Sequence, residues 1–296
     1  MRLEHPIFHS PIEPDLDLTL LDVPADYRHG GDPLPAKLLG WKVHDGEFPE
    51  VDVGMVSDPI GFEDSPDAEW ISSGLNSKGP RSVALGRQGN LFSWGFYGAP
   101  DRMTHGAKAV FLNTICYMKQ FEGQTALVEK ERPARDWVFR YLGYLRELGS
   151  RKDIDTSWIT GFFPKDVIDA YSDAEQIEQY YRENVEYLYH DGQNLVVDED
   201  LCIVGVSNRR PEFLSTMLAR LVLDPKDERA LTLIDRYVGG DAAADAESFA
   251  EWVRDNGPWL FFSDVGGFRW RTDVHARARA CPAKVATAEP APFKGS

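Results

Sequence analysis

The chain has 296 residues, of which 43% are hydrophobic and 27% charged, a balance typical of a folded globular protein with one large or two ordinary domains. The formal net charge of −16 would repel phosphate backbones and anionic membrane surfaces, so nucleic acids and membrane surfaces are not expected as partners. No run of 18 apolar residues is present, and the sequence therefore predicts no membrane span.

The N-terminus contains no apolar segment of the kind that a signal peptide requires, which favours a cytoplasmic protein. If the natural chain begins further upstream, a periplasmic or secreted location is the alternative. Cys116, Cys202 and Cys281 lie far apart and are odd in number, so neither a disulfide framework nor a zinc site is predicted. The histidines show no metal-binding spacing, and we expect no metal and no cofactor.

Residues 1–130 are rich in proline and glycine and contain short strand candidates at 51–56, 82–85 and 91–96. The last two are separated by the turn-like tetrad at 87–90. Apolar residues then recur with helical spacing over 103–120, where Asp101 or Thr104 can cap the start and Gly123 can end the helix. A strand pair followed by a packed helix predicts an α/β N-terminal region.

Residues 131–275 are predicted to form a mainly helical region. Helical patterns cover 136–148, 164–171, 172–189, a segment that begins at Pro211, 227–238 and 247–255. Ser172 and Glu175 would form a capping box for the third of these helices. Residues 259–270 look extended, with Gly266 and Gly267 as the turn of a hairpin. The segment 276–296 is rich in alanine, proline and lysine and is predicted to be a disordered tail.

The densest group of functional side chains lies in the segment 54–120, and its first part is an acidic loop. That loop carries the carboxylates Asp58, Glu63, Asp64, Asp67 and Glu69, which could hold a cation, act in acid–base catalysis, or form a solvated turn. A calcium-binding EF-hand is excluded, because the twelfth position of the loop is a glycine and a proline interrupts it.

Two further features follow the acidic loop along the chain. Lys78 lies in a small-residue loop with Asn76 and could bind a carboxylate or a sugar hydroxyl, or belong to an exposed turn. Trp94 lies on a strand that must bury one face, so it is either a core residue or a ring on which a sugar stacks. The sequence contains neither a G-x-S-x-G nucleophile elbow nor a C-x-x-C motif. It therefore does not predict an enzyme that uses a side-chain nucleophile.

The segment His5-Pro6-Ile7, the residues Gly86, Arg87, Gly89, Asn90, Trp94, Gly95 and Phe96, and the helical stretch 113–117 carry a family resemblance. Together they resemble the second half of a ThuA-like (trehalose-utilisation) domain, of the class I glutamine-amidotransferase-like superfamily. The whole chain also resembles uncharacterised proteins of environmental bacteria that join such a region to a helical segment. The resemblance implies a partial flavodoxin-like sheet over 1–130 and a link to carbohydrates. The half that would carry the nucleophile elbow is missing, which argues against amidotransferase chemistry.

Two functional hypotheses follow. The first is a carbohydrate-linked binding protein, or an enzyme of unknown reaction, with a site over residues 58–94. Its expected catalytic residues are Asp64, Asp67, Lys78 and Arg87, and its expected ligand-binding residues are Glu69, Asn76, Asn90 and Trp94. The second is a non-catalytic scaffold protein that forms a homo-oligomer, with a partner surface on the helical region that includes Tyr180, Tyr189, Trp252 and Trp259.

Overall fold

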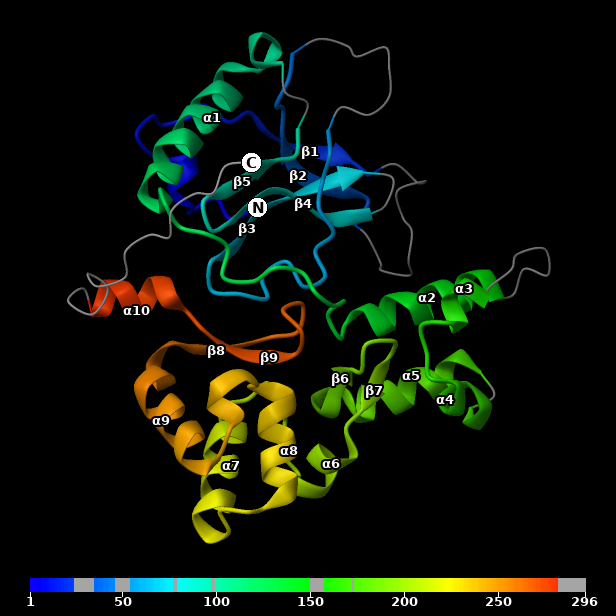
Figure 1. Cartoon of the computed structure of the whole chain (residues 1–296). Helices are drawn as coiled ribbons and strands as arrows, with labels where there is room; N and C mark the ends of the chain where they lie inside the picture. The colour runs from blue at the N-terminus through cyan, green and yellow to red at the C-terminus, as the bar shows by residue number, and fades with distance from the viewer. Residues whose placement is uncertain are drawn as a thin grey trace, which may run out of the picture.

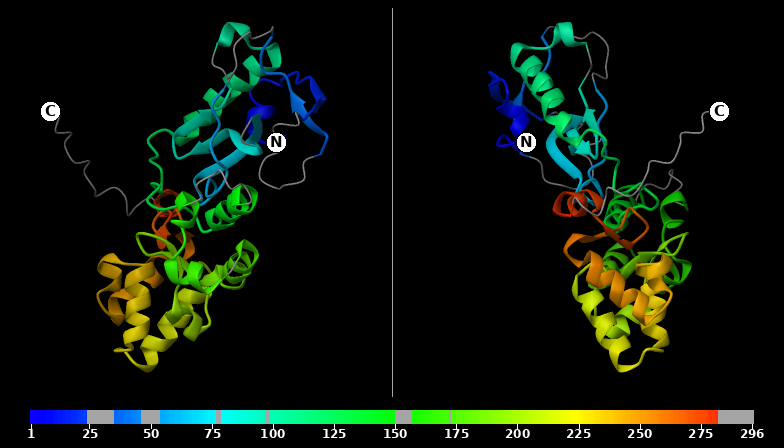
Figure 2. Two further views of the ribbon diagram at one scale, coloured as in Figure 1. Left: turned by 90° about the vertical axis from the view of Figure 1, so that its right-hand side faces the viewer. Right: turned by 60° about the vertical axis from the view of Figure 1, so that its left-hand side comes forward.

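The computed structural model of the chain describes residues 1–23, 35–45, 54–76, 79–96, 99–149, 157–171 and 173–281. Figure 1 shows an N-terminal region of small sheets with one long helix, and a C-terminal region built mainly from helices. The two regions are stacked along the long axis of the molecule, as the side views in Figure 2 show. The hairpin formed by the last two strands lies between them (Figure 1).

The N-terminal region contains two small antiparallel sheets. Strands β1 (Leu18–Asp22) and β2 (Lys37–Trp41) pair with each other. Strands β3 (Ala68–Asn76), β4 (Gly79–Gln88) and β5 (Leu91–Trp94) form a sheet in that order. Gly89, with a φ of 54°, and Asn90 make the tight turn between β4 and β5, which confirms the hairpin expected near 87–90.

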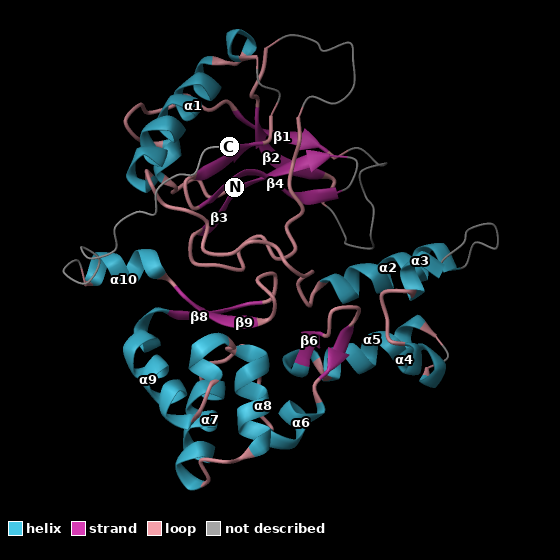
Figure 3. Cartoon of the chain, viewed as in Figure 1, coloured by secondary structure: helices cyan, strands magenta, loops and turns pink. Residues whose placement is uncertain are grey.

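The predicted partial flavodoxin-like sheet over 1–130 is wrong, because every strand pair in the described part of this region is antiparallel. A parallel pair needs a crossover of a dozen or more residues, usually a helix. Only two residues separate β3 from β4, and only two separate β4 from β5. The helix α1 follows all three strands and does not connect any of them (Figure 3). The strand expected at 51–56 is not found in its described part, where Gly54 forms an isolated bridge with Phe96 and residues 55 and 56 are irregular. Residues 51–53 lie outside the described residues.

Helix α1 (His105–Met118) begins where the spacing predicted, with the Thr104 side chain accepting a hydrogen bond from the Ala107 amide. Its buried face includes Ala107, Val110 and Thr114, but Ile115 is 56% exposed. Asn113, rather than Ile115, is fully buried. Its side-chain amide donates to the carbonyls of Ile7 and Ile12 and accepts from the Ile12 amide, which attaches the N-terminal segment to the helix. The helix thereby closes a core formed by residues of β2, β3, β4 and the 3₁₀ turn η1 (Pro6–Phe8).

The C-terminal region begins with α2 (Trp137–Gly149), α3 (Ser157–Thr160), α4 (Lys165–Ala170) and α5 (Ala174–Glu183). The hairpin β6 (Leu188–His190)–β7 (Leu195–Val197) follows. Then come α6 (Glu199–Val204), α7 (Glu212–Leu223), α8 (Glu228–Tyr237) and α9 (Ala246–Asn256). Strands β8 (Leu260–Ser263) and β9 (Arg269–Thr272) form the expected hairpin, and α10 (Val274–Ala280) ends the described chain.

Two details of this region differ from the sequence expectations. The helix predicted for 172–189 ends at Glu183, because Leu188–His190 pair with β7 instead of continuing the helix. Asp173 caps its start by accepting from the Gln176 amide, while Ser172 lies outside the described residues. The first part of the predicted tail, residues 276–280, belongs to α10, and 282–296 lie outside the described residues.

The helical region has two apolar cores. One lies among α6, α7, α8 and α9 and includes the fully buried Phe213, Leu233 and Phe249. The other lies among α2, α4, α5 and β6, around Leu142 and Tyr181. Phe262 of β8 packs against both, so the last hairpin holds the helical region together. Among the helices of the described segments, none has the length and apolar composition needed to cross a bilayer.

Candidate functional site

The turn of the β8–β9 hairpin docks onto the acidic loop of the N-terminal region. Asp64 accepts three hydrogen bonds there: from the Ser263 hydroxyl, from the Asp264 amide at 3.2 Å and from the Val265 amide at 2.9 Å. The Val265 carbonyl accepts from the amides of Glu131 and Arg132, at 2.7 and 3.0 Å. Residues separated by up to about 200 positions are therefore joined at one point, which we call the junction.

Gly266 makes this close docking possible. A Cβ atom there would lie 2.7 Å from the Ser263 hydroxyl oxygen, 2.8 Å from Arg271 Nε and 2.9 Å from a methyl group of Val128. Because Cβ atoms do not approach other atoms below about 3 Å without displacement, a larger residue here would have to move the side chains of Ser263, Arg271 and Val128. The sequence analysis identified this glycine as part of a turn, but its contacts with residue 128 appear only in the folded chain.

Below the turn, Asp264 forms a buried ion pair with Arg135. The guanidinium donates from Nε to both carboxylate oxygens, at 3.1 and 2.8 Å, and from Nη2 to Oδ1 at 2.7 Å. Arg135 is 1% exposed, and it also donates to the Val185 carbonyl and the Asn208 side chain. A charge-assisted, bidentate pair of this kind fixes the hairpin turn to the start of α2.

A pocket of about 310 Å³ lies beside the junction, on the side of the acidic loop. Its polar lining combines two carboxylates, two hydroxyls, an amide and one lysine: Asp58, Asp64, Ser57, Ser65, Gln88 and Lys130. Its apolar lining is made by Ile60, Gly61, Phe62, Val128 and Val265. Its walls come from the acidic loop, the end of β4, the segment that leads into α2 and the β8–β9 turn, and none of them forms the pocket alone.

Asp64 is the pocket carboxylate with a raised pKa. Partial burial and the neighbouring Asp264 charge oppose its ionisation, and the Ser263 hydrogen bond compensates only in part, so that its pKa rises to about 6. A carboxyl group with this pKa can take up or release a proton near neutral pH. An ionised carboxylate has about four acceptor positions, and three donors occupy three of them, which leaves one position on Oδ1.

The other charged groups of the pocket are more exposed. Asp58 caps its own loop by accepting from the Ile60 amide at 2.9 Å, and it lies 3.5 Å from Arg140. Lys130 is exposed, and its ammonium lies 5.8 Å from the centre of the Trp137 ring. Gln88 donates to the Val128 carbonyl at 2.9 Å, which holds the end of β4 against the pocket wall.

Glu69 and Arg87 lie outside this pocket, in a cluster with His5 and Tyr117 in which Arg87 is buried and the other three side chains are half-buried. Arg87 donates to Glu69 at 2.9 Å, and the Tyr117 hydroxyl contacts both oxygens of Glu69, at 3.0 and 2.8 Å. His5 lies 3.6 Å from the same carboxylate. Arg87 is 4% exposed and is covered by the ring of Phe121, 3.8 Å away.

The electrostatics of this cluster indicate a permanently ionised pair. Burial opposes ionisation of Glu69, but the nearby His5 ring and the hydrogen bonds from Arg87 and Tyr117 outweigh it and lower its pKa to about 2. The same burial and the Glu69 charge raise the pKa of Tyr117 far above its ordinary value. Because its carboxylate and guanidinium bind each other, we assign the cluster a structural role: it joins η1, β3, β4 and α1.

The remaining candidates are separated as well. Asp67 is buried and accepts from the Ser65 hydroxyl at 2.6 Å and from the Leu127 amide at 2.9 Å, so it fixes the chain after α1. Asn90 is exposed on the β4–β5 turn. Trp94 packs edge-on against Phe96 and Phe111 in the N-terminal core. Asn76 ends β3, its side chain is not described, and Lys78 lies outside the described residues.

Of the eight residues predicted from the sequence as catalytic or ligand-binding, the structure thus places Asp64 in the pocket. Sequence reasoning missed Gln88, Lys130 and Val265, which also line it. Gln88 belongs to the tetrad that the sequence marked as a turn, but in the structure it ends β4. No local pattern distinguishes Lys130 from an ordinary surface lysine, because its position beside Asp64 depends on the fold.

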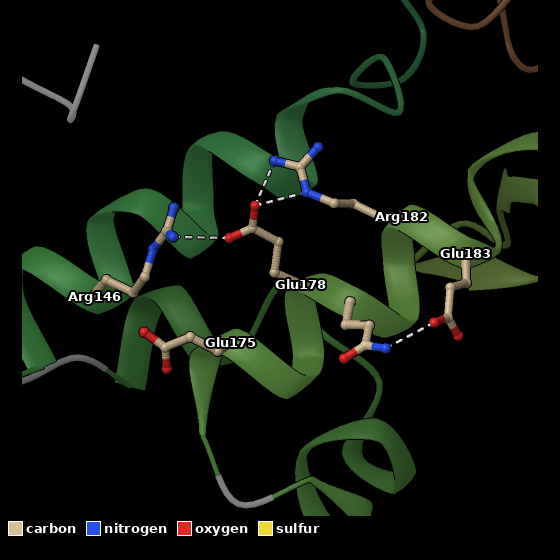
Figure 4. A pocket seen from close by; sticks show the side chains of 6 residues that line it. Arg146, Glu175, Glu178, Arg182 and Glu183 are labelled. Carbon is tan, nitrogen blue, oxygen red and sulfur yellow. Dashed lines mark hydrogen bonds and ion pairs between the residues drawn. The ribbon is translucent and has the colours of Figure 1, made fainter. Parts of the chain in front are cut away.

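A second, larger depression of about 460 Å³ lies between α2 and α5 (Figure 4). Glu178 there binds Arg146 at 3.0 Å and also Arg182, while Gln179 donates to Glu183 at 2.8 Å. These are ion pairs and hydrogen bonds between neighbouring turns of surface helices, which contribute little individually. We regard this depression as a surface groove, since its charged groups other than Glu175 already bind one another or Gln179.

Within the described segments, no three His, Cys, Asp or Glu side chains are arranged to hold a metal ion. Comparisons with known proteins give no assignment: no family model matches the chain, and neither a curated protein nor a solved structure is significantly similar to it.

Proposed function

We propose that the protein binds a small, hydroxyl-rich ligand of the carbohydrate class in the pocket beside the junction. The observation that carries the proposal is Asp64, a carboxylate with one open acceptor position in a concave site that is shared by both regions of the chain. Ligand sites are commonly found in such clefts, with a few convergent polar groups and a residue of perturbed pKa. A volume of about 310 Å³ is at the small end for ligand pockets and suits a ligand of one sugar unit.

The pocket chemistry agrees with this ligand class in three respects. Asp64 and Asp58 accept hydrogen bonds, Lys130 donates them, and Gln88 can do both, which matches the mixed donors and acceptors of a sugar. Phe62 and Ile60 add an apolar wall. If the protein is an enzyme, Asp64 is the general acid or base, because its pKa lies near neutral pH. Arg87 has no part in this version, since it is buried against Glu69.

The test is a thermal-shift screen of neutral sugars, amino sugars and sugar acids, followed by calorimetric titration. A ligand at 100 times its Kd stabilises the native state by about 2.7 kcal/mol, which raises the melting temperature by several degrees. We expect Asp64→Asn and Lys130→Ala to reduce binding at least tenfold. Asn90→Ala is the matched control, because Asn90 is an exposed loop residue outside the pocket. A panel with no stabilising ligand, or equal binding by all three variants, would contradict the proposal.

A homo-oligomeric scaffold remains the second candidate, and one observation favours it. On the β1–β2 ribbon, Leu18, Leu20 and Leu39 share one face in register and are 39%, 61% and 54% exposed. Within the described residues β1 pairs only with β2, so its other edge is unpaired. An exposed apolar edge strand is a template for pairing with a second copy. The partner surface was expected on the helical region instead, but three of its four expected aromatic residues, Tyr180, Tyr189 and Trp252, pack against the helical cores.

This second candidate predicts that Leu20→Lys converts a dimer into a monomer, because a charge would be buried at the paired edge. The measurement is solution mass by light scattering over a range of concentrations. Leu223→Lys serves as the control, since Leu223 is 88% exposed at the end of α7, far along the chain from the ribbon. A wild-type protein that is monomeric at all concentrations would exclude this arrangement.

A further inference from the structure

The junction contains one carboxylate more than its buried cation can neutralise. Asp64 and Asp264 are adjacent, since the amide of Asp264 donates to Asp64 Oδ1 at 3.2 Å. The Arg135 guanidinium binds both oxygens of Asp264 and does not reach Asp64. Among the described residues, no lysine, arginine or histidine forms an ion pair with Asp64. Ionised Asp64 is therefore the excess negative charge at this contact.

The partners of Asp64 are the parts of the hairpin turn that dock it. Ser263 is fully buried; its hydroxyl donates to Asp64, and its oxygen accepts from the Gly266 amide at 2.8 Å. The amide of Val265 donates to the same carboxylate. When Asp64 is hydrated instead, these three hydrogen bonds are lost, and the turn loses its polar contacts with the acidic loop.

The charged groups around Asp64 come from three elements. The acidic loop contributes Asp58, which lies 3.5 Å from Arg140. The segment before α2 contributes Lys130, in the same pocket, and Glu131, which binds Arg271 of β9 at 2.8 Å. Arg135 and Asp264 lie on the buried side. Each of these groups apart from Lys130 has an opposite charge of its own, Asp264 included. Asp264 is nevertheless the neighbouring charge that raises the pKa of Asp64, after burial, because its backbone amide binds the Asp64 carboxylate directly.

We propose that the junction is a pH-responsive latch between the two regions, which tightens when Asp64 takes up a proton and loosens when Asp64 ionises. A neutral carboxyl group removes the repulsion from Asp264 and the cost of holding a charge away from water. It keeps its acceptor oxygens for the two amides, and the Ser263 oxygen can accept its proton. The latch does not depend on a ligand, so it can hold or fail independently of the proposed binding function.

The direction and size of the effect follow from linkage. In the closed junction the pKa of Asp64 is about 6, and in an opened, hydrated junction it returns to its ordinary value of 3.8. The closed form therefore binds the proton more tightly, and its advantage is complete below pH 3.8 and is lost as the pH rises through about 6. With these two pKa values the opening equilibrium rises roughly 50-fold between pH 4 and pH 7.

Hydrogen–deuterium exchange of the full chain tests the latch. We expect the opening constant of peptides from residues 57–66 and 260–272 to rise roughly 50-fold from pH 4 to pH 7, after correction for intrinsic exchange. Peptides from the α7–α8 core should show no comparable change. Asp64→Asn, which is neutral at every pH, should abolish the rise. Asp58→Asn is the matched control, because it removes the other carboxylate of the pocket, and it should leave the rise in place.

A pH-independent opening constant in the wild type, or a full rise in Asp64→Asn, would overturn the proposal. If Asp64→Asn does not fold, a carbon-detected NMR titration of the aspartate carboxyl groups in the wild-type chain replaces it. One carboxyl should then titrate near pH 6, together with shifts in the amides of Asp264 and Val265. Titration of all aspartates near their ordinary values would contradict the latch.

Discussion

Asp264→Asn is expected to lower the free energy of unfolding by about 3–5 kcal/mol at pH 7. Asparagine keeps the shape of the side chain but leaves the buried Arg135 guanidinium without its counter-charge. The substitution also weakens the contact of Asp264 with the Arg135 backbone amide, now at 3.0 Å. Urea denaturation followed by circular dichroism measures the change.

Asp58→Asn is the control for this prediction. Asp58 and Arg140 lie 3.5 Å apart, with side chains that are 37% and 28% exposed, so solvent screens the pair. Its loss should cost less than about 1 kcal/mol. Equal destabilisation by the two variants would show that the Arg135–Asp264 pair carries no special weight in the fold.

Glu69→Gln is expected to destabilise the N-terminal region by about 2–4 kcal/mol at pH 7, because Arg87 is buried and loses its counter-ion. It should also remove an acid dependence. The pKa of Glu69 is lowered to about 2 from 4.5, so its contribution to stability is present above pH 4.5 and is lost as the pH falls through about 2. Unfolding measured from pH 7 to pH 2 should therefore show a smaller acid-induced loss in the variant than in the wild type.

Glu63→Gln is the matched control, since Glu63 also accepts from an arginine, at 2.6 Å, but both side chains of that pair are substantially exposed. Its effect on the free energy of unfolding should be small, because solvent screens an exposed ion pair. The Glu69 and Asp64 effects are distinguishable, because ionisation stabilises the fold at Glu69 and destabilises it at Asp64. If Glu69→Gln lost as much stability in acid as the wild type does, the structural role assigned to the Glu69 cluster would be wrong.

Much of the secondary structure could be predicted from the sequence, because it depends on local signals. Thr104 caps α1, the hairpin at 259–270 turns at its glycines, and the helices of the C-terminal region follow their apolar spacing. The error in sheet type has a different origin. Alternating apolar residues identify a strand, but they do not show which strand it pairs with or in which direction.

The candidate site was predicted only in part, for a related reason. The acidic loop was predicted as a single site, but its carboxylates lie in different places: Asp64 lines the pocket, Asp67 is buried under the chain after α1, and Glu69 binds Arg87. Asp64 and Asp67 lie in the turns before β3 and Glu69 lies on that strand, so the chain changes direction between them and closeness in sequence does not make a shared site. Their partners, Leu127, Tyr117 and Ser263, come from distant segments.

The sequence by itself determined the acidic surface charge, the helical character of residues 131–275 and the position of the polar loop, since these follow from composition and from spacing over a few turns. The tertiary structure alone decided that the strands are antiparallel and that the β8–β9 turn closes onto the loop. It also decided that Asp64 lies beside the Asp264 carboxylate, and that of these two carboxylates the nearby Arg135 binds only Asp264. Burial and pairing of charges are set by contacts between residues about 200 positions apart, and no local pattern encodes them.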